Sequence, residues 1–418
     1  MTLTKQIPRE KGLDHTLSVL KEGYLFIPNR LEKFRSPIFE TRLLGQRAIV
    51  ISGKDAAELF YDEAKMKRSH VIPKRIQKSL FGVGGVQGLD DRAHRHRKQL
   101  FMSLLTRERV TGLLELVENQ LKRAAVQWER MPAVPLFREM EKLLFHAVCQ
   151  WAGVPLWAKE LDQRAKDMDS MIEAFGAVGF RHIRGRKARK RSELWIESII
   201  EQVRAGKLFP DQNSALFQIS WHKELNGSLL DSKVATVELI NILRPTVAVA
   251  RFITFGVVAW ADYPDTRVKF MEGNEKDRLM FVQEVRRYYP FGPFLGAKTR
   301  FNFNWKGYPF KEGTLVVLDI YGTNHSEEIW EEPNTFSPER FEGWKGSPFS
   351  FIPQGGGDDD VGHRCAGEGI TVELMKTCLG VLTDQLSYSL PSQDLTYRFD
   401  RIPSIPESRV VLTNVKRK

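Results

Sequence analysis

Apolar residues recur every three or four positions through most of this chain, and this period predicts amphipathic helices. The longest such run covers residues 231–261, with Asp231 as its N-cap. Alternating apolar and polar residues, which predict strands, are confined to the two ends of the chain. We therefore expect a mainly α protein, a large helical body with a small β-sheet region. The other helices are expected at about 92–105, 107–130, 137–152, 158–176, 189–205, 278–289 and 366–386.

The predicted strands fall into three groups: a hairpin of residues 38–44 and 47–52 joined through Gly45, short strands within 301–319, and a last strand at 409–413. No linker, low-complexity tract or repeat divides the chain, so we expect a single domain over residues 1–418. No apolar stretch reaches the roughly 18 residues that span a bilayer. The N-terminal residues lack the apolar core of a signal peptide. We therefore expect a cytoplasmic protein without a membrane span.

Of the three cysteines, Cys365 is the candidate for chemistry. Cys149 and Cys378 lie in apolar helical segments, and no C-x-x-C pair exists, so zinc, iron–sulfur and disulfide frameworks are not expected. Cys365 ends a glycine-rich loop just before a helix, where backbone N–H groups favour a thiolate. A cysteine thiolate is one of the few axial ligands of haem iron. The alternative is that Cys365 is only a small buried apolar residue.

The net charge of +11 includes a basic run at residues 181–191. Such a run could bind nucleic acid or an anionic surface, or attract an anionic substrate. The alternative is a solvated helix start and loop. No aromatic residues alternate with the charges of this run, which disfavours a nucleic-acid site.

A second motif supports haem chemistry. Glu284 and Arg287 form E-x-x-R on one face of a predicted helix, and Arg340 in a later P-E-R-F segment could join them in a three-charge network. The order of these motifs, followed by the glycine-rich loop of Cys365, resembles the cytochrome P-450 haem-thiolate enzymes along essentially the whole chain. The resemblance implies haem b with Cys365 as its iron ligand, and a structural role in folding for the three charged residues.

Two departures from the family pattern narrow the choice of branch within the family. The cysteine loop is longer than usual, since Phe351 lies fourteen residues before Cys365 rather than seven, and its Asp358–Asp360 run suggests either a calcium site or, as we favour, a solvated turn. The long helix carries Arg244-Pro245 where oxygen-activating members have an acid before Thr246. Proline should kink the helix there by freeing a backbone carbonyl.

Arg244 is expected on an apolar stripe with no acid within one helical turn, so its partner could be a ligand carboxylate. The alternatives are a haem propionate or an exposed position, and Arg251 is a weaker candidate for the same role. Arg244-Pro245 together with the long loop resembles the fatty-acid peroxygenase branch. That branch implies a long-chain fatty acid and hydrogen peroxide as partners, without an obligatory reductase.

The resemblance also implies a mechanism. The fatty-acid carboxylate, held by Arg244 beside Pro245, acts as general acid–base in place of the missing protein acid. Hydroxylation then falls on the α or β carbon, with decarboxylation to a terminal alkene as a side reaction. Gln87 stands where some relatives carry His; because Gln cannot donate a proton as His can, we expect hydroxylation to predominate. Gln87 could equally only pack against the haem edge.

Further assignments follow the family pattern. The basic helix of His94, Arg97 and Lys98 is expected to bind the haem propionates, or else to be a solvated helix. A segment after the E-x-x-R helix is expected to line the substrate pocket, or to belong to the core; its residues are Phe291, Phe294 and Leu295. The rival functions are a reductase-dependent monooxygenase, a haem-thiolate sensor or carrier without turnover, and a nucleic-acid binder.

Overall fold

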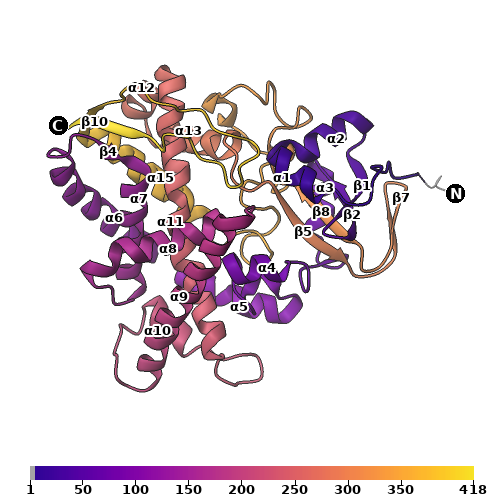
Figure 1. Cartoon of the computed structure of the whole chain (residues 1–418), viewed down its shortest axis with the longest axis horizontal. Helices are drawn as coiled ribbons and strands as arrows, with labels where there is room; N and C mark the ends of the chain where they lie inside the picture. Colours follow the sequence, from indigo (N-terminus) through magenta and orange to yellow (C-terminus); the bar gives the residue numbers. More distant parts are fainter. Residues whose placement is uncertain (1–4) are drawn as a thin grey trace.

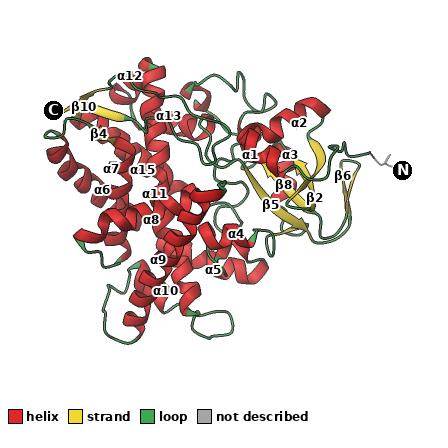
Figure 2. Cartoon of the chain, viewed as in Figure 1, coloured by secondary structure: helices red, strands yellow, loops and turns green. Residues whose placement is uncertain are grey.

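A computed structural model describes residues 5–418 of the protein. Figure 1 shows a large helical body, which holds the C-terminus, beside a smaller β region, which holds the N-terminus. Helix is the predominant secondary structure throughout (Figure 2). One large apolar cluster forms the core of the helical body, and two smaller clusters pack around the sheet of the β region. The expectation of a mainly α fold with a small β region is therefore confirmed.

The helices include all those that the apolar period predicts. They are α1 (Thr16–Glu22), α2 (Phe26–Phe34), α3 (Lys54–Tyr61), α4 (Lys74–Ile76), the π-helical segment η2 (Gln77–Phe81), α5 (Asp91–Leu104), α6 (Arg107–Trp128), α7 (Leu136–Ala152), α8 (Leu161–Glu173), α9 (Gly179–Arg204), α10 (Ala215–Ser220), α11 (Ser232–Asp262), α12 (Pro264–Glu272), α13 (Glu275–Tyr288), α14 (Ile320–Asn324) and α15 (Glu368–Gly380).

The start of α9 differs from the prediction. We expected a helix from residue 189 preceded by basic loop, but α9 begins at Gly179, so the whole basic run 181–191 is helical. Three of its arginines contact protein: Arg181 and Arg191 pair with Glu173 and Asp167 of α8, and Arg189 is buried. These tertiary contacts stabilise a helix in a stretch whose own apolar period is weak.

The strands are β1 (Ile38–Leu43), β2 (Gln46–Ile51), β3 (Met66–Lys67), β4 (Val134–Pro135), β5 (Phe294–Thr299), β6 (Phe303–Trp305), β7 (Tyr308–Phe310), β8 (Leu315–Asp319), β9 (Leu386–Ser389) and β10 (Val411–Arg417). The predicted hairpin is confirmed as β1–β2, with β8 added in parallel to β2. The main sheet has the order β1-β2-β8-β5-β3. Sequence reasoning missed β3 and β4, which are two residues long, and β5 and β9, which lack clear alternation of apolar and polar residues.

The long helix α11 crosses the helical body and contacts α7, α9 and α15. Asp231 caps it as predicted, because its carboxylate accepts hydrogen bonds from the backbone N–H groups of Lys233 and Val234. The helix continues through Pro245. By length and hydropathy α11 could cross a membrane, contrary to our expectation that no stretch reaches that length, but 89% of its most apolar window is buried inside the protein. Cys149 and Cys378 are both buried, on α7 and α15, as expected.

Candidate functional site

Cys365 lies at the end of its loop, three residues before α15 begins. Its backbone N–H donates to the carbonyl of Gln354 at 3.1 Å, and the Gln354 side-chain amide points at the Cys365 sulfur at 3.7 Å. Burial raises the pKa of the Cys365 thiol, although the Gly367 backbone N–H, Lys98 and the Gln354 amide act in the opposite direction. The Gly367 N–H thus favours a thiolate, as expected, whereas burial opposes it. A metal ion on the sulfur would supply the missing positive charge.

Gln354 is a site residue that sequence reasoning missed. Its amide also donates to the Thr371 hydroxyl at 3.0 Å, and its carbonyl oxygen accepts from Arg286 at 3.2 Å. Arg286 is buried and forms an ion pair with Glu368, so the amide is fixed from two sides. The signal was present in the loop, where Pro-Gln-Gly-Gly precedes Cys365, but only the folded chain brings it to the sulfur.

The basic residues of α5 lie beside the cysteine loop. Lys98 donates to the backbone carbonyls of Gly362 and Arg364 at 2.9 and 2.6 Å, and the His94 ring stacks on that of His363 with centroids 3.8 Å apart. Burial lowers the pKa of His94 to about 4, and Lys98 adds to this shift. These contacts tie α5 to the loop that carries the candidate haem ligand.

Arg97 of the same helix is almost fully buried and pairs with Glu238 at 2.7 Å and with Glu224. Two buried nitrogen atoms of α5 nevertheless stay without a partner within the described chain, Nδ1 of His94 and Nε of Arg97. A buried polar atom without a hydrogen-bond partner is costly. The Cys365 sulfur and the basic residues of α5 fit a haem whose iron is bound by the cysteine and whose carboxylates are bound by the basic side chains. The assignment of His94, Arg97 and Lys98 to the propionates stays a prediction.

Arg244 is a buried cation without an acidic partner. Only 5% of the residue is exposed. Its guanidinium donates to the backbone carbonyl of Leu80, reaches the side-chain oxygen of Asn241 at 3.4 Å, and lies 5.7 Å from the centre of the Phe81 ring. Burial, together with the nearby Arg189, lowers the pKa of Arg244 to about 9. Among residues 5–418 no carboxylate pairs with this group, so an anionic ligand would relieve its desolvation.

Asn241 links Arg244 to Gln87. Its amide nitrogen donates to the Gln87 side-chain oxygen at 3.3 Å and to Glu238 at 3.2 Å. The structure therefore brings together Gln87 and Arg244, which are far apart in the sequence, through a residue that sequence reasoning did not single out. Gln87 lies in a short 3₁₀ segment after η2, so its position depends on this loop.

The neighbouring side chains of α11 do not offer a free acid or alcohol. Thr246 donates its hydroxyl to the carbonyl of Ile242 at 3.0 Å, one turn back in the same helix. Glu238 is fully buried and paired with Arg97. Arg251, our weaker candidate for the carboxylate anchor, is paired with Asp169 at 3.0 Å and with Glu173. The charge of Arg251 is thus already neutralised, and that assignment is wrong.

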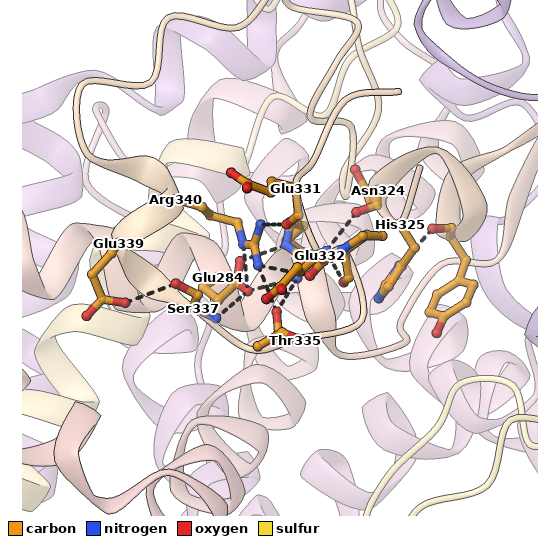
Figure 3. Close-up of polar contacts among 12 residues, drawn as sticks. Glu284, Asn324, His325, Glu331, Glu332, Thr335, Ser337, Glu339 and Arg340 are labelled. Atoms are coloured by element: carbon orange, nitrogen blue, oxygen red, sulfur yellow. Dashed lines mark hydrogen bonds and ion pairs between the residues drawn. The ribbon is translucent and has the colours of Figure 1, made fainter. Parts of the chain in front are cut away.

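The predicted three-charge cluster is present (Figure 3). Glu284 is fully buried and accepts from Arg287 at 2.7 Å and from Arg340 at 3.1 Å. The two arginines also donate to backbone carbonyls of the segment between them, which holds the chain from residue 324 to 340 against α13. In Figure 3 the Arg340 side chain lies between Glu284 and the backbone of Glu331 and Thr335.

The predicted pocket residues occupy different surroundings. Phe291 packs on Phe252 of α11, with ring centroids 4.9 Å apart, next to the main core. Phe294 begins β5 and packs against the smaller apolar cluster, whereas Leu295 is 37% exposed. Their role in lining a substrate channel stays a prediction.

In the cysteine loop, Asp358–Asp360 are exposed, and Asp358 accepts from two backbone N–H groups of its own turn, as expected for a solvated turn.

This chain is similar to known proteins in both sequence and structure. The family model for cytochrome P-450 matches residues 279–407. The structure of cytochrome P-450EX alpha (CYP152N1) with myristic acid is 46% identical and covers 99% of this chain and 100% of its own, with a TM-score of 0.96. A variant of cytochrome P-450 OleT in complex with arachidonic acid is 38% identical, covers 99% of both chains and has a TM-score of 0.96. Bovine (Bos taurus) cytochrome P-450 26B1 is 23% identical over 93% of this chain and 81% of its own.

Proposed function

Because this chain belongs to the fatty-acid peroxygenase branch of the cytochrome P-450 family, we propose that it uses hydrogen peroxide to hydroxylate long-chain fatty acids at the α and β carbons. The observation that carries the proposal is the buried guanidinium of Arg244, which has no acidic partner in the described chain. A fatty-acid carboxylate supplies that partner, since arginine binds a carboxylate through two parallel hydrogen bonds. Decarboxylation to a terminal alkene is a side reaction of the same site.

Haem b, held by Cys365 with His94, Arg97 and Lys98 near its propionates, would supply the oxidising chemistry on peroxide. The chain itself anchors the substrate. With its carboxylate on Arg244, only the carbons next to the head group can approach the reacting centre, which selects the α and β positions. Gln87 and Asn241 hold the guanidinium side of this anchor through their own hydrogen bonds.

The proton transfer is the second part of the proposal. No protein acid is free near Arg244, because Glu238 is paired and Thr246 is bonded back to its own helix. The anchored carboxylate therefore takes the general acid–base role itself, moving a proton between the two oxygens of peroxide. This also supports a reaction without a reductase. A reductase-dependent monooxygenase would need a protein relay at this position.

Incubation of the purified haem protein with myristic acid and hydrogen peroxide, without NADPH or partner proteins, tests this function. We expect 2- and 3-hydroxy acids by gas chromatography. Absence of product beyond a free-haem control, or product only with a reductant and reductase, would refute it. Arg244→Ala should abolish turnover while the ferrous–carbon monoxide spectrum keeps its thiolate band; Cys365→Ser should lose that band.

We also infer a single domain over residues 1–418 and a cytoplasmic location. The main core cluster supports the first inference, because it joins residues from Leu80 to Val415 in one apolar interior. Limited proteolysis tests the domain assignment. A single domain should resist cleavage up to one protease concentration and should then be degraded as a whole. Cell fractionation tests the location.

A further inference from the structure

The outer face of α9 carries exposed apolar residues. Phe180 is 87% exposed, Leu194 60% and Ile183 49%, and Val178 just before the helix is 50% exposed. Because Phe180, Ile183 and Leu194 are spaced by three and eleven residues, they lie on one side of the helix. Large apolar side chains gathered in this way on a water-facing surface indicate an interaction site for a protein or a membrane.

The same face is strongly basic. Arg184, Lys187 and Lys190 are exposed and alternate with the apolar residues along the helix, with no ion-pair partner in the described part of the chain. Next to them, α9 and η2 border a surface groove of about 420 Å³. Its lining is also basic and apolar, with Lys78 and Val83 on one side and Arg186 on the other, and the groove's one acid, Glu193, pairs with Arg189. We call the exposed residues within 178–194, together with Lys78 and Val83, the α9 face.

We propose that the α9 face docks on an anionic phospholipid bilayer. Apolar side chains enter the boundary between head groups and acyl chains, while lysine and arginine beside them bind the lipid phosphates. Each such cation near an anionic membrane strengthens binding roughly fivefold. Single-stranded nucleic acid is the less suitable partner, because its bases need several aromatic platforms and this face offers only Phe180.

The position of this face relative to Arg244 gives the docking a purpose, which rests on the proposed function. On its inner side, Arg189 of α9 donates to the backbone carbonyl of Leu80 at 2.8 Å. Arg244 donates to the same carbonyl from the interior. The segment η2 therefore contacts both α9 and the carboxylate anchor. Long-chain fatty acids partition into bilayers, so docking here delivers substrate beside its anchor.

Vesicle co-sedimentation of the intact haem protein tests the proposal. We expect binding to vesicles of phosphatidylcholine with about 30% phosphatidylglycerol and little binding to phosphatidylcholine alone. Lys187→Glu/Lys190→Glu should weaken binding at least tenfold, whereas Lys54→Glu/Lys345→Glu, an equal charge change at exposed sites outside this face, should not. Phe180→Ser/Leu194→Ser should weaken binding while its salt dependence remains.

No binding to anionic vesicles at low salt, or equal loss in both charge-reversal variants, would overturn the proposal; binding of duplex DNA in preference to vesicles would reassign the face. Turnover of decanoate, which is dissolved in water, separates this result from the proposed function. Docking variants should oxidise decanoate at the unmodified rate. If they do so but fail to oxidise myristate presented in anionic vesicles, the α9 face acts in delivery.

Discussion

Arg189 and Arg244 donate to one and the same acceptor, the backbone carbonyl of Leu80. Both guanidinium groups are buried. Among residues 5–418 the only carboxylate paired with either of them is Glu193, which is bound to Arg189 and partly exposed. Proximity to Arg189 contributes to the lowered pKa of Arg244. The carboxylate anchor is thus an electrostatically unfavourable arrangement that a bound anion improves.

Replacement of Arg189 tests its positioning role. In Arg189→Met the Leu80 carbonyl loses one of its two donors, so the orientation of Arg244 becomes less defined. We expect myristate to bind roughly fivefold more weakly, which corresponds to the net value of about 1 kcal/mol for one hydrogen bond. The measurement is a titration of the haem spin state with myristate. Arg186→Met, at an exposed neighbouring site, is the control and should bind as tightly as the unmodified protein; unchanged binding in Arg189→Met would exclude the role.

Asn241 should influence which carbon is oxidised. Asn241→Leu removes the bonds to Gln87 and Arg244, so the head group can move relative to the reacting centre. We expect a changed ratio of 2- to 3-hydroxy acid and a lower rate, by roughly tenfold, because misplacement of a substrate by fractions of an ångström is costly. Chromatography of the products measures both. An identical product ratio at full rate would show that the link has no role.

Glu284 should be essential for stability. Glu284→Gln keeps the shape of the side chain but leaves the buried cation Arg287, and with it Arg340, without compensating charge. We expect the free energy of unfolding to fall by about 3–5 kcal/mol, with poor retention of haem. The control is Glu339→Gln, because the Glu339 carboxylate pairs with Lys269 at the surface. Its free energy of unfolding, measured with urea, should change by less than about 0.5 kcal/mol. Equal effects in the two variants would contradict the account.

His325 should make the protein sensitive to mild acid. Burial, and to a smaller extent Arg287, lowers the pKa of His325 to about 4 from the ordinary value near 6.5. The unfolded chain therefore binds a proton before the folded one does, and stability present above pH 6.5 is lost as the pH falls toward 4. The loss is about 3 kcal/mol at most. In His325→Gln the slope of unfolding free energy between pH 6.5 and 4 should be shallower than in the unmodified protein; parallel curves would contradict this.

The helices and the charged cluster could be predicted because their signals are local. Apolar period defines α11, and the spacing of Glu284 and Arg287 places them on one face regardless of the rest of the fold. The surroundings of the site could not be predicted in this way. The Leu80 acceptor is a backbone atom with no signature in the residue type, and the contact of Gln354 with the Cys365 sulfur depends on the path of a loop.

Arg251 shows the opposite failure. It lies on the same helix as Arg244, seven residues on, and the sequence near it contains no acid, so both arginines were candidates for the anchor. Its partners Asp169 and Glu173 come from α8, a distant part of the chain. Ion pairs between separate elements depend on tertiary packing, so the periodicity of the sequence cannot predict them.

The substrate carboxylate, bound to Arg244, is expected to perform the acid–base step. This role is tested most directly by comparing peroxide-driven oxidation of myristic acid with that of methyl myristate, which has the same chain but no ionisable group. The account predicts hydroxylation of the acid and no product from the ester above a free-haem control. Oxidation of the ester at a comparable rate would contradict it.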